Sequence, residues 1–297
     1  MDKLLSGLAR VRESYRTKKN IDATIKKKFL SCIYEFYDRN YRHLPWRNTD
    51  NPYHILVSEV MLQQTQVSRV IEKYSTFIKK FPTVETLAQA SLHDVLATWQ
   101  GLGYNRRAKY LWQAAQIIVS QYNGTVPDNH HALHKLPGLG KATTASVAIF
   151  AFGRSELYIE TNVRTVYIYS FFADNEKVSD AMIEPLLKAT IDTTNPKKFY
   201  NALMDCGTYI KQHYNFSRHS AHYTVQTPYS TSLRKVRGDI VRYIVNNGAA
   251  NNDMLVQSLG YAPEKIQKAL EALCRENMVC EDNGIYTIPS RELIKNN

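Results

Sequence analysis

The stretch LPGLGK, residues 136–141, decides the fold of this chain. It lies between two segments of helical periodicity and carries two glycines, Gly138 and Gly140, two positions apart. Glycine allows a tight backbone turn, so amide groups at the N-terminus of the second helix can point at a phosphate oxygen. The same turn could be a plain connector between helices. The residues that follow it along the chain favour the phosphate-binding interpretation.

A carboxylate follows the turn at a distance that corresponds to one helix and the segment that leads back from it. Glu160 stands twenty residues after Gly140, at the start of the next helix, in the run YIETNVR. This spacing predicts that the carboxylate comes back beside the turn. Cleavage of an N-glycosidic bond builds positive charge on the sugar, which a carboxylate can stabilise or attack. The alternative is that Glu160 only complements the dipole of its own helix.

The net charge indicates the class of partner. The chain of 297 residues has 38 Lys and Arg against 27 Asp and Glu, a formal charge of +11 and a pI near 9.3. This balance suits a polyanionic partner, although a merely soluble basic protein would have it too. With 44% hydrophobic residues the chain can bury a substantial core, and its length favours two domains over one.

The sequence also predicts a compartment. Residues 1–19 carry short apolar runs interrupted by charges, without a secretory hydrophobic region or a cleavage site. No stretch approaches the ~20 consecutive apolar residues of a membrane span. We therefore expect no membrane partner and a location that is cytoplasmic, in a bacterial or archaeal nucleoid, or otherwise intracellular. The scattered cysteines predict reduced structural thiols rather than disulfides or a metal site; they are Cys32, Cys206, Cys274 and Cys280.

Helical periodicity recurs from about residue 20 to residue 220, and alternating strand patterns are nearly absent, so we expect an all-α body. Asn51 is a natural N-cap before Pro52. Ser91 starts another helix, with Asp94 at the capping-box distance and Gly101 as its stop. Further helices are predicted at 106–121, 141–152, 162–172 and 196–211.

A polar stretch at residues 215–232, without a clear period, is the candidate linker. Beyond it we predict helices at 233–246, 252–259 and 263–276, then a β-hairpin around the turn Asp282-Asn283-Gly284. Three helices and a hairpin predict a small winged-helix-like domain at 226–297, or else a packing module that contacts no DNA. Residues 1–225 would form the other domain.

Five motifs occur in the order and spacing of a known family: PWR at 45–47, PY at 52–53, SEVMLQQTQV at 58–67, GLGY at 101–104 and the LPGLG turn. Over residues 20–215 the chain resembles the MutY family of adenine DNA glycosylases, within the helix-hairpin-helix (HhH-GPD) superfamily. The resemblance implies the all-α helix-hairpin-helix glycosylase fold. It implies two helical lobes, one of residues 1–45 and 160–225, the other of residues 46–159. We expect a monomer whose partner is double-stranded DNA with a mispaired or damaged base.

The resemblance assigns chemistry to two carboxylates. Glu59 corresponds to the general acid that protonates the departing adenine, which leaves far more readily once a ring nitrogen is protonated. Its helix is otherwise poor in charge, so partial burial is expected to raise the pKa of Glu59 toward the working range. The alternative for Glu59 is an ordinary surface position. Glu160 corresponds to the residue that stabilises the charge on the sugar.

The resemblance also implies the contacts with DNA. An extruded base leaves a vacancy that must be filled, and the base needs an apolar pocket with a few polar groups. The residues implied for the base pocket and for intercalation are Trp46, Arg47, Leu62, Gln63, Gln64, Thr65, Leu102, Tyr104 and Asn162. Taken singly, Trp46 and Leu62 would be ordinary core residues. The DNA phosphates are expected at Gly138, Gly140, Lys141 and Thr143.

Two departures from the family concern the reaction. The family has an aspartate where this chain has Glu160, so the reach to the sugar changes by one methylene. The Lys that bifunctional relatives carry two residues after the second glycine is Ala142 here. Without that amine no Schiff base and no lyase reaction by the usual route is expected. Lys141 is adjacent, but it points elsewhere on the helix and suits a phosphate.

Two further departures concern the segments after the body. Lys211, Arg218 and Ala221 stand where three cysteine ligands of the family's iron–sulfur cluster would fall, and since ligation needs thiolates, no cluster is expected. A structural monovalent cation at the hairpin is the one ion still envisaged. The run SRHS at 217–220 would hold the same loop against DNA or form a solvated linker. The winged-helix-like module replaces the family's NUDIX-like domain, which senses 8-oxoguanine.

The leading hypothesis is a monofunctional adenine glycosylase that acts opposite 8-oxoguanine or guanine in base excision repair. A mismatch thymine or uracil glycosylase on the same scaffold is the alternative, since the change at Glu160 and the missing sensor domain would suit another base. A non-catalytic DNA-lesion binder is disfavoured because both carboxylate positions remain acidic. A transcription regulator, which a winged helix would suggest, has no support from the first 215 residues.

Overall fold

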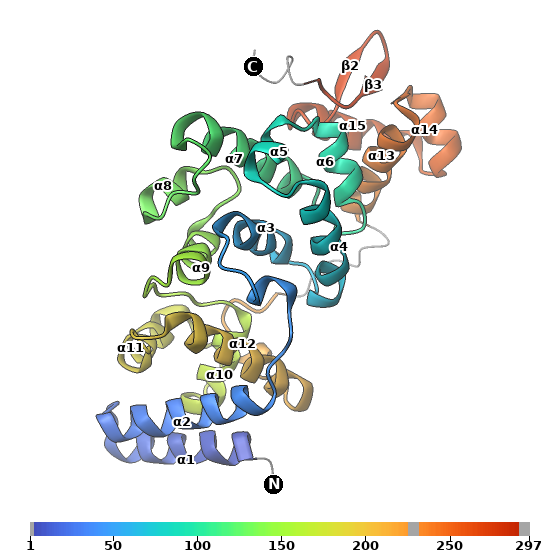
Figure 1. Ribbon diagram of the computed structural model, residues 1–297. Helices are drawn as coiled ribbons and strands as arrows, with labels where there is room; N and C mark the ends of the chain where they lie inside the picture. The colour runs from blue at the N-terminus through green and yellow to red at the C-terminus, as the bar shows by residue number, and fades with distance from the viewer. Residues whose placement is uncertain (1–2, 225–231, 291–297) are drawn as a thin grey trace. The chain divides into compact units, whose positions relative to one another are not determined.

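The computed structural model describes residues 3–224 and 232–290, and helices dominate it (Figure 1). The chain folds into two compact units, the first of residues 1–47 and 140–225, the second of residues 48–139 and 226–297. Each unit therefore combines two segments that are far apart in the sequence. The chain passes from the second unit back to the first within the LPGLGK turn.

The first unit is built from two pairs of packed helices. The helices α1 and α2 lie side by side, and α10 packs against α12 (Figure 1). A Cβ atom added to Gly207 would lie 2.4 Å from the Asn162 carbonyl oxygen, so glycine is what allows α10 and α12 to approach. The elements are α1 Lys3–Lys18, α2 Ala23–Arg39, η1 Pro45–Arg47, α9 Lys141–Phe152, α10 Thr161–Phe171, α11 Asp180–Thr190, α12 Pro196–His213 and η2 Phe216–His219.

Two tryptophans lie in the core of the second unit. Trp99 and Trp112 are fully buried, and the Trp112 indole donates a 3.0 Å hydrogen bond to the Ala90 carbonyl, which satisfies its polar edge. The elements are α3 Pro52–Leu62, α4 Val67–Lys80, α5 Val84–Gln89, α6 Leu92–Trp99, α7 Arg106–Tyr122, α8 His130–Lys135, α13 Leu233–Asn247, β1 Ala249–Ala250, α14 Asn252–Leu259, α15 Pro263–Arg275, β2 Cys280–Asp282 and β3 Ile285–Thr287.

Local chemistry explains where these helices begin and end. Asn51 caps α3 by accepting a 2.9 Å hydrogen bond from the Tyr53 amide, and Ser91 caps α6 by accepting one of 3.0 Å from the Asp94 amide. The Asp94 carboxylate then accepts from the Ser91 hydroxyl, at 2.6 Å, instead of closing a full capping box. The helix ends at Trp99, two residues before Gly101 with its φ of 94°. The predicted N-caps at Asn51 and Ser91 are therefore confirmed, whereas the capping box predicted for Ser91 and Asp94 is not formed.

The structure adds order at both ends of the first unit. Residues 3–18, which carry no helix prediction, form α1, with Leu8 and Val11 completely buried. Part of the predicted linker is also tied to the body, because the Val178 amide donates to the His219 carbonyl at 2.7 Å. The Ala221 amide returns a 2.9 Å bond to the Val178 carbonyl. Residues 225–231 of that linker lie outside the described residues.

The C-terminal module, residues 232–290, contains the three predicted helices and the predicted hairpin. Its strands form an antiparallel sheet in the order β1-β3-β2, in which β1 is an addition to the prediction. Asn283 and Gly284 have φ values of 51° and 78°, as a two-residue hairpin turn requires. Three helices and a small sheet fit a winged-helix arrangement, which stays a prediction.

The module is attached to α6 and α7 of its own unit by polar contacts. The Lys109 ammonium donates to the Asn277 carbonyl at 3.1 Å. His93 Nε2 lies 2.8 Å from the Val245 carbonyl oxygen, and the Gln100 amide donates to Asn246 Oδ1 at 3.1 Å. The module and the helices α6 and α7 therefore belong to one compact unit. Among the described residues, no helix has the length and apolar character needed to cross a bilayer.

Candidate active site

Glu59 lies on α3, a helix that carries no other Asp, Glu, Lys or Arg. α3 has buried residues on every face, and Glu59 itself is 9% exposed. Its neighbour Ser58 is fully buried and satisfies its hydroxyl by donating to the Ile55 carbonyl at 2.8 Å. The burial of Glu59 contradicts the alternative that this residue occupies an ordinary surface position.

The loop that follows α3 carries three of the predicted intercalating residues. Gln64 has a φ of 53° and is exposed, while Gln63 and Thr65 are half-buried. The Gln63 amide donates a 3.1 Å hydrogen bond to the Gly138 carbonyl. The loop at 63–65 is thus attached to the LPGLGK turn, as the prediction of one shared site requires.

A second loop, GLGYN at 101–105, faces the first. Gly101 and Gly103 have φ values of 94° and 69°, and Tyr104 has one of 47°. Tyr104 is 37% exposed, whereas Leu102 is buried at 3%. Of the two residues of this loop that are predicted to enter DNA, Tyr104 is therefore the exposed one, and Leu102 is buried.

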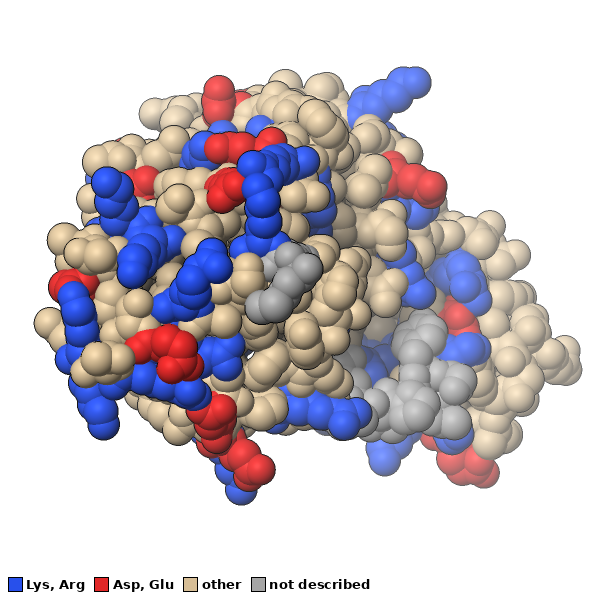
Figure 2. Space-filling view, turned by 90° about the horizontal axis from the view of Figure 1, so that it is seen from below, with Lys and Arg blue, Asp and Glu red and all other residues tan. Residues whose placement is uncertain are grey.

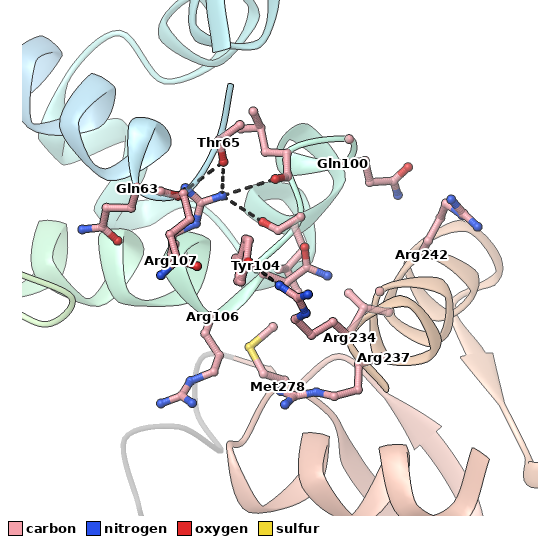
Figure 3. Close-up of a pocket in the computed structure, with 18 of the residues that line it drawn as sticks. Gln63, Thr65, Gln100, Tyr104, Arg106, Arg107, Arg234, Arg237, Arg242 and Met278 are labelled. Carbon is pink, nitrogen blue, oxygen red and sulfur yellow. Dashed lines mark hydrogen bonds between the residues drawn. The ribbon is translucent and has the colours of Figure 1, made fainter. Parts of the chain in front are cut away.

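Arg107, which sequence reasoning missed, holds both loops. Its guanidinium is buried, and burial lowers the pKa of Arg107 to about 10, so the group stays charged at neutral pH. Its two terminal nitrogens donate six hydrogen bonds of 2.5 to 3.3 Å, among them the bond to Thr65 that Figure 3 shows. The acceptors are the carbonyls of Val60, Met61, Gln63, Leu102 and Gly103 and the hydroxyl of Thr65. One cation thereby fixes the end of α3 and both loops.

The two loops line a single open cavity of about 980 Å³ within the second unit (Figure 3). The opposite wall comes from α13 and α15 of the C-terminal module. The Tyr104 ring stands between two cations, with the Arg107 and Arg234 guanidinium carbons 5.3 and 5.5 Å from its centroid. This contact orients the ring toward the cavity.

The LPGLGK turn needs its first glycine for two reasons. Gly138 has a φ of 80°, which favours glycine, and a Cβ atom there would lie 2.8 Å from Tyr110 Cβ. Gly140 then caps α9 without any side-chain cap bond, and the exposed Lys141 begins the helix. The amides at a helix N-terminus are a ready site for an anion. Thr143, the last of the predicted phosphate contacts, is half-buried on the first turn of α9.

In the first unit, Glu160 is held as the N-cap of α10. Its Oε1 accepts hydrogen bonds from the Asn162 and Val163 amides at 2.7 and 3.1 Å, and its Oε2 accepts from the Asn162 side chain at 3.2 Å. Asn162 in turn accepts from the Thr208 hydroxyl on α12, at 3.4 Å. The carboxylate is therefore fixed in orientation. The charge of Glu160 also acts on Lys211. The pKa of Lys211 lies below its ordinary value, because burial lowers it more than the Glu160 charge raises it.

The other two predicted pocket residues of the first unit lie on η1. Trp46 is 8% exposed. The Arg47 guanidinium makes a two-pronged ion pair with Asp205, with both contacts at 2.8 Å, and Arg42 binds the same carboxylate at 2.5 Å. Asp205 was missed because a lone acidic residue inside an amphipathic helix resembles a surface position. Only its burial, at 2% exposure, identifies it as the anchor of Arg47.

The residues at the end of α12 and after it do not fit an iron–sulfur cluster. Lys211, Arg218 and Ala221 supply no thiolate. Cys32 and Cys206 belong to the first unit, and Cys274 and Cys280 belong to the second. Within residues 3–224 and 232–290, no group of three or more His, Cys, Asp and Glu side chains is placed to hold a metal ion.

The chain matches known proteins over part of its length. A family model described as "HhH-GPD superfamily base excision DNA repair protein" matches residues 57–205. Adenine DNA glycosylase of Buchnera aphidicola is 39% identical over 187 residues, which are 61% of this chain and 52% of that protein. The enzyme of the same name from Homo sapiens is 34% identical over 194 residues, covering 61% of this chain and 36% of that protein. The chain thus spans about half the length, or less, of these relatives.

Solved structures give the same fold. A thermostable thymine-DNA glycosylase aligns with a TM-score of 0.56 and 30% identity, covering 63% of this chain and 88% of that one. Endonuclease III in a non-covalent DNA complex aligns with a TM-score of 0.52 and 21% identity, covering 62% and 86%. The predicted helix-hairpin-helix glycosylase fold is confirmed by these matches and by the helical content of the structure.

Proposed function

Because the chain belongs to the HhH-GPD superfamily of base excision DNA repair proteins, we propose that it is a monofunctional DNA glycosylase. Its substrate is adenine mispaired with 8-oxoguanine or guanine in double-stranded DNA. The observation that carries this proposal is Glu59, a carboxyl group buried in an apolar helix directly before the loop at 63–65. The names of the relatives support adenine as the base.

In the proposed reaction, Glu59 gives a proton to a ring nitrogen of adenine, and the C1′–N9 bond breaks with its electron pair going to the base. The Glu160 carboxylate, oriented by the amides of α10, stabilises the positive charge that develops on the sugar. Water then adds its oxygen to C1′ and releases a proton. Ala142 offers no amine for a Schiff base, so the reaction stops at the abasic site.

The two loops and the turn supply the contacts with DNA in this proposal. Gln64 and Tyr104 enter the duplex beside the extruded base, with Gln63, Thr65 and Leu102 beneath them. The extruded adenine lies against Trp46, Arg47, Leu62 and Asn162. The phosphates meet the N-terminus of α9 at Gly138, Gly140, Lys141 and Thr143. The charge of +11, spread over faces such as that in Figure 2, favours a duplex as partner.

The proposal also covers the oligomeric state, the bound ions and the domain organisation of the protein. The protein works as a monomer, without an iron–sulfur cluster, in whatever compartment holds the DNA. A monovalent cation at the carbonyls of the LPGLGK turn is the one ion envisaged. Residues 1–225 form the glycosylase domain, with lobes of residues 1–45 with 160–225 and of residues 46–159, and residues 226–297 form the added winged-helix-like domain.

A glycosylase assay on a panel of mispairs tests the substrate. We expect release of free adenine from duplexes with A:8-oxoguanine and A:G pairs, and an alkali-labile abasic site in the product strand. Processing of T:G or U:G pairs alone would replace adenine with a pyrimidine as the substrate.

A conservative substitution tests the acid. Glu59→Gln keeps the size of the side chain and removes the proton donor, so single-turnover excision should fall by at least 100-fold. Glu72→Gln, an exposed change of the same kind on α4, should excise at the wild-type rate. Excision by Glu59→Gln as fast as that of the wild type would show that the protein uses another mechanism.

A further inference from the structure

The cavity between the two loops and the C-terminal module is strongly cationic. Six arginines line it against one acidic side chain, Asp239; they are Arg69, Arg106, Arg107, Arg234, Arg237 and Arg242. Four glutamines share the lining, namely Gln63, Gln64, Gln66 and Gln100. Arginine and glutamine are side chains that bind phosphate and sugar oxygens in protein–DNA complexes.

The arginines of α13 reach the loop that we propose enters DNA. Arg234 donates a hydrogen bond to the Tyr104 hydroxyl and also stacks on the ring of this residue (Figure 3). Arg237 and Arg242 lie on the same helix, at three and eight positions beyond Arg234. The module therefore presents a row of cations to the cavity that Gln64 and Tyr104 also line.

Acidic partners orient these cations without covering them. Arg242 donates to Asp239 at 2.6 Å, yet its side chain is 57% exposed. Arg106 lies 3.5 Å from Glu276 and is 51% exposed, and Arg237 binds the same carboxylate. A guanidinium group has five N–H donors in a planar fork, so an exposed one can hold a carboxylate and a phosphate together.

We propose that the cavity is a second DNA-contact surface, to which the C-terminal module contributes Arg237 and Arg242 while α4 and α7 contribute Arg69 and Arg106. These four arginines bind phosphates of the strand that carries the partner base. That strand is the one next to Gln64 and Tyr104 once these residues replace the extruded adenine. The inference rests on the proposed function in taking a mispaired duplex as the ligand. It assigns the module to nucleic acid and not to a protein partner.

Salt dependence of binding in the full chain tests the phosphate contacts. We expect the double variant Arg69→Gln/Arg242→Gln to bind an A:8-oxoguanine duplex about 10-fold more weakly at moderate salt. The slope of log affinity against log salt concentration should fall by roughly 2, because each lost phosphate contact removes about 0.9.

A matched variant controls for the change in net charge. Lys268→Gln/Arg275→Gln removes two exposed cations from α15, outside the cavity lining. It should keep the wild-type affinity, salt slope and melting temperature. Equal losses in the two double variants would mean a diffuse charge effect and would overturn the assignment to the cavity.

Duplexes with single neutral methylphosphonate linkages test the choice of strand. Neutral linkages flanking the partner base should weaken binding of the wild type and have little effect on Arg69→Gln/Arg242→Gln. The proposal is overturned if the neutral linkages weaken binding equally in the wild type and in the variant. It is also overturned if binding depends on linkages in the adenine strand instead. Arg69→Gln/Arg242→Gln could also keep the wild-type affinity for DNA and lose the binding of poly-glutamate. That result would make the cavity a protein-binding site and would overturn the proposal.

The outcomes separate this inference from the proposed function. If no duplex releases adenine but the salt slope still falls in Arg69→Gln/Arg242→Gln, the enzymatic proposal fails and the contact surface stands. If adenine is released and the slopes agree, the contact surface fails and the enzymatic proposal stands.

Discussion

A single buried guanidinium organises the two loops that we propose enter DNA. Arg107 donates to five carbonyl groups and one hydroxyl at the end of α3 and in both loops. Carbonyl groups that lose a charged donor inside a protein are costly to leave unsatisfied. The structural effect of this residue therefore exceeds that of an ordinary surface cation.

Arg107→Lys tests this role, because lysine keeps the charge and loses the planar fork of donors. We expect a loss of about 2–4 kcal/mol in the free energy of unfolding, measured by denaturant titration. We also expect excision to slow, since Gln64 and Tyr104 lose their support. Arg39→Lys, an exposed change on α2 with a side chain 57% exposed, should cost less than about 0.5 kcal/mol. Equal stability of both variants would show that the hydrogen bonds of Arg107 are dispensable.

Gly138 allows a second test at the same scale. Gly138→Ala should destabilise the chain by about 2–3 kcal/mol, because it combines a left-handed φ with a Cβ contact of 2.8 Å to Tyr110. Gly153→Ala is the matched control, with a φ of 65° and no atom within 4 Å of the new Cβ. It should cost only about 1 kcal/mol. The difference between the two melting temperatures then measures the contact with Tyr110, and no difference would mean that the turn relaxes.

At the scale of single elements, the helix α13 is stabilised by ion pairs and hydrogen bonds of one carboxylate, Asp239. Asp239 accepts hydrogen bonds from Lys235 at 2.8 Å and Tyr261 at 2.6 Å, besides its ion pair with Arg242. Burial acts to raise the pKa of Asp239, but these partners outweigh it, and the pKa lies below its usual value. A depressed pKa stabilises the folded state above the ordinary pKa, and this stabilisation is lost as the pH falls through the depressed value.

Asp239→Asn should therefore lower the stability of the protein near neutral pH by about 2 kcal/mol. The gap in melting temperature between wild type and variant should narrow as the pH falls below about 4, where the wild-type carboxylate also becomes protonated. Asp253→Asn on α14, an exposed change, should track the wild type at every pH. A gap that stays constant with pH would mean that the carboxylate charge contributes nothing.

At the scale of the whole molecule, the C-terminal module and residues 48–139 form one compact unit. Regions that share a core open together in hydrogen exchange, whereas independent domains open separately. We expect slow amides of α6, α7, α13 and α15 to report the same opening free energy. Lys109→Met removes the ammonium that binds the carbonyls of Glu276 and Asn277, and should lower protection in α15 more than in α3. Distinct opening free energies in the wild type would argue for a separately folded module.

Much of this fold could be predicted from sequence, because the deciding features are local. The bounds of α9 and α14 match the predictions residue for residue, and those of α7, α10 and α13 match within about one, since caps, glycines and periodicity act over a few residues. α1 escaped prediction because its charged residues interrupt the apolar runs, and its burial against α2 arises only in the folded chain.

The turn at LPGLGK and the buried Glu59 could thus be located from sequence, since a left-handed glycine and a charge within an apolar run are visible in the chain itself. Tertiary structure alone decided the partners of Arg107, the pairing of Arg47 with Asp205 and the placement of the arginines of α13 beside Tyr104. These contacts join residues far apart in the sequence. Periodicity states which face of a helix is buried, but the side chains that meet there depend on how distant elements pack.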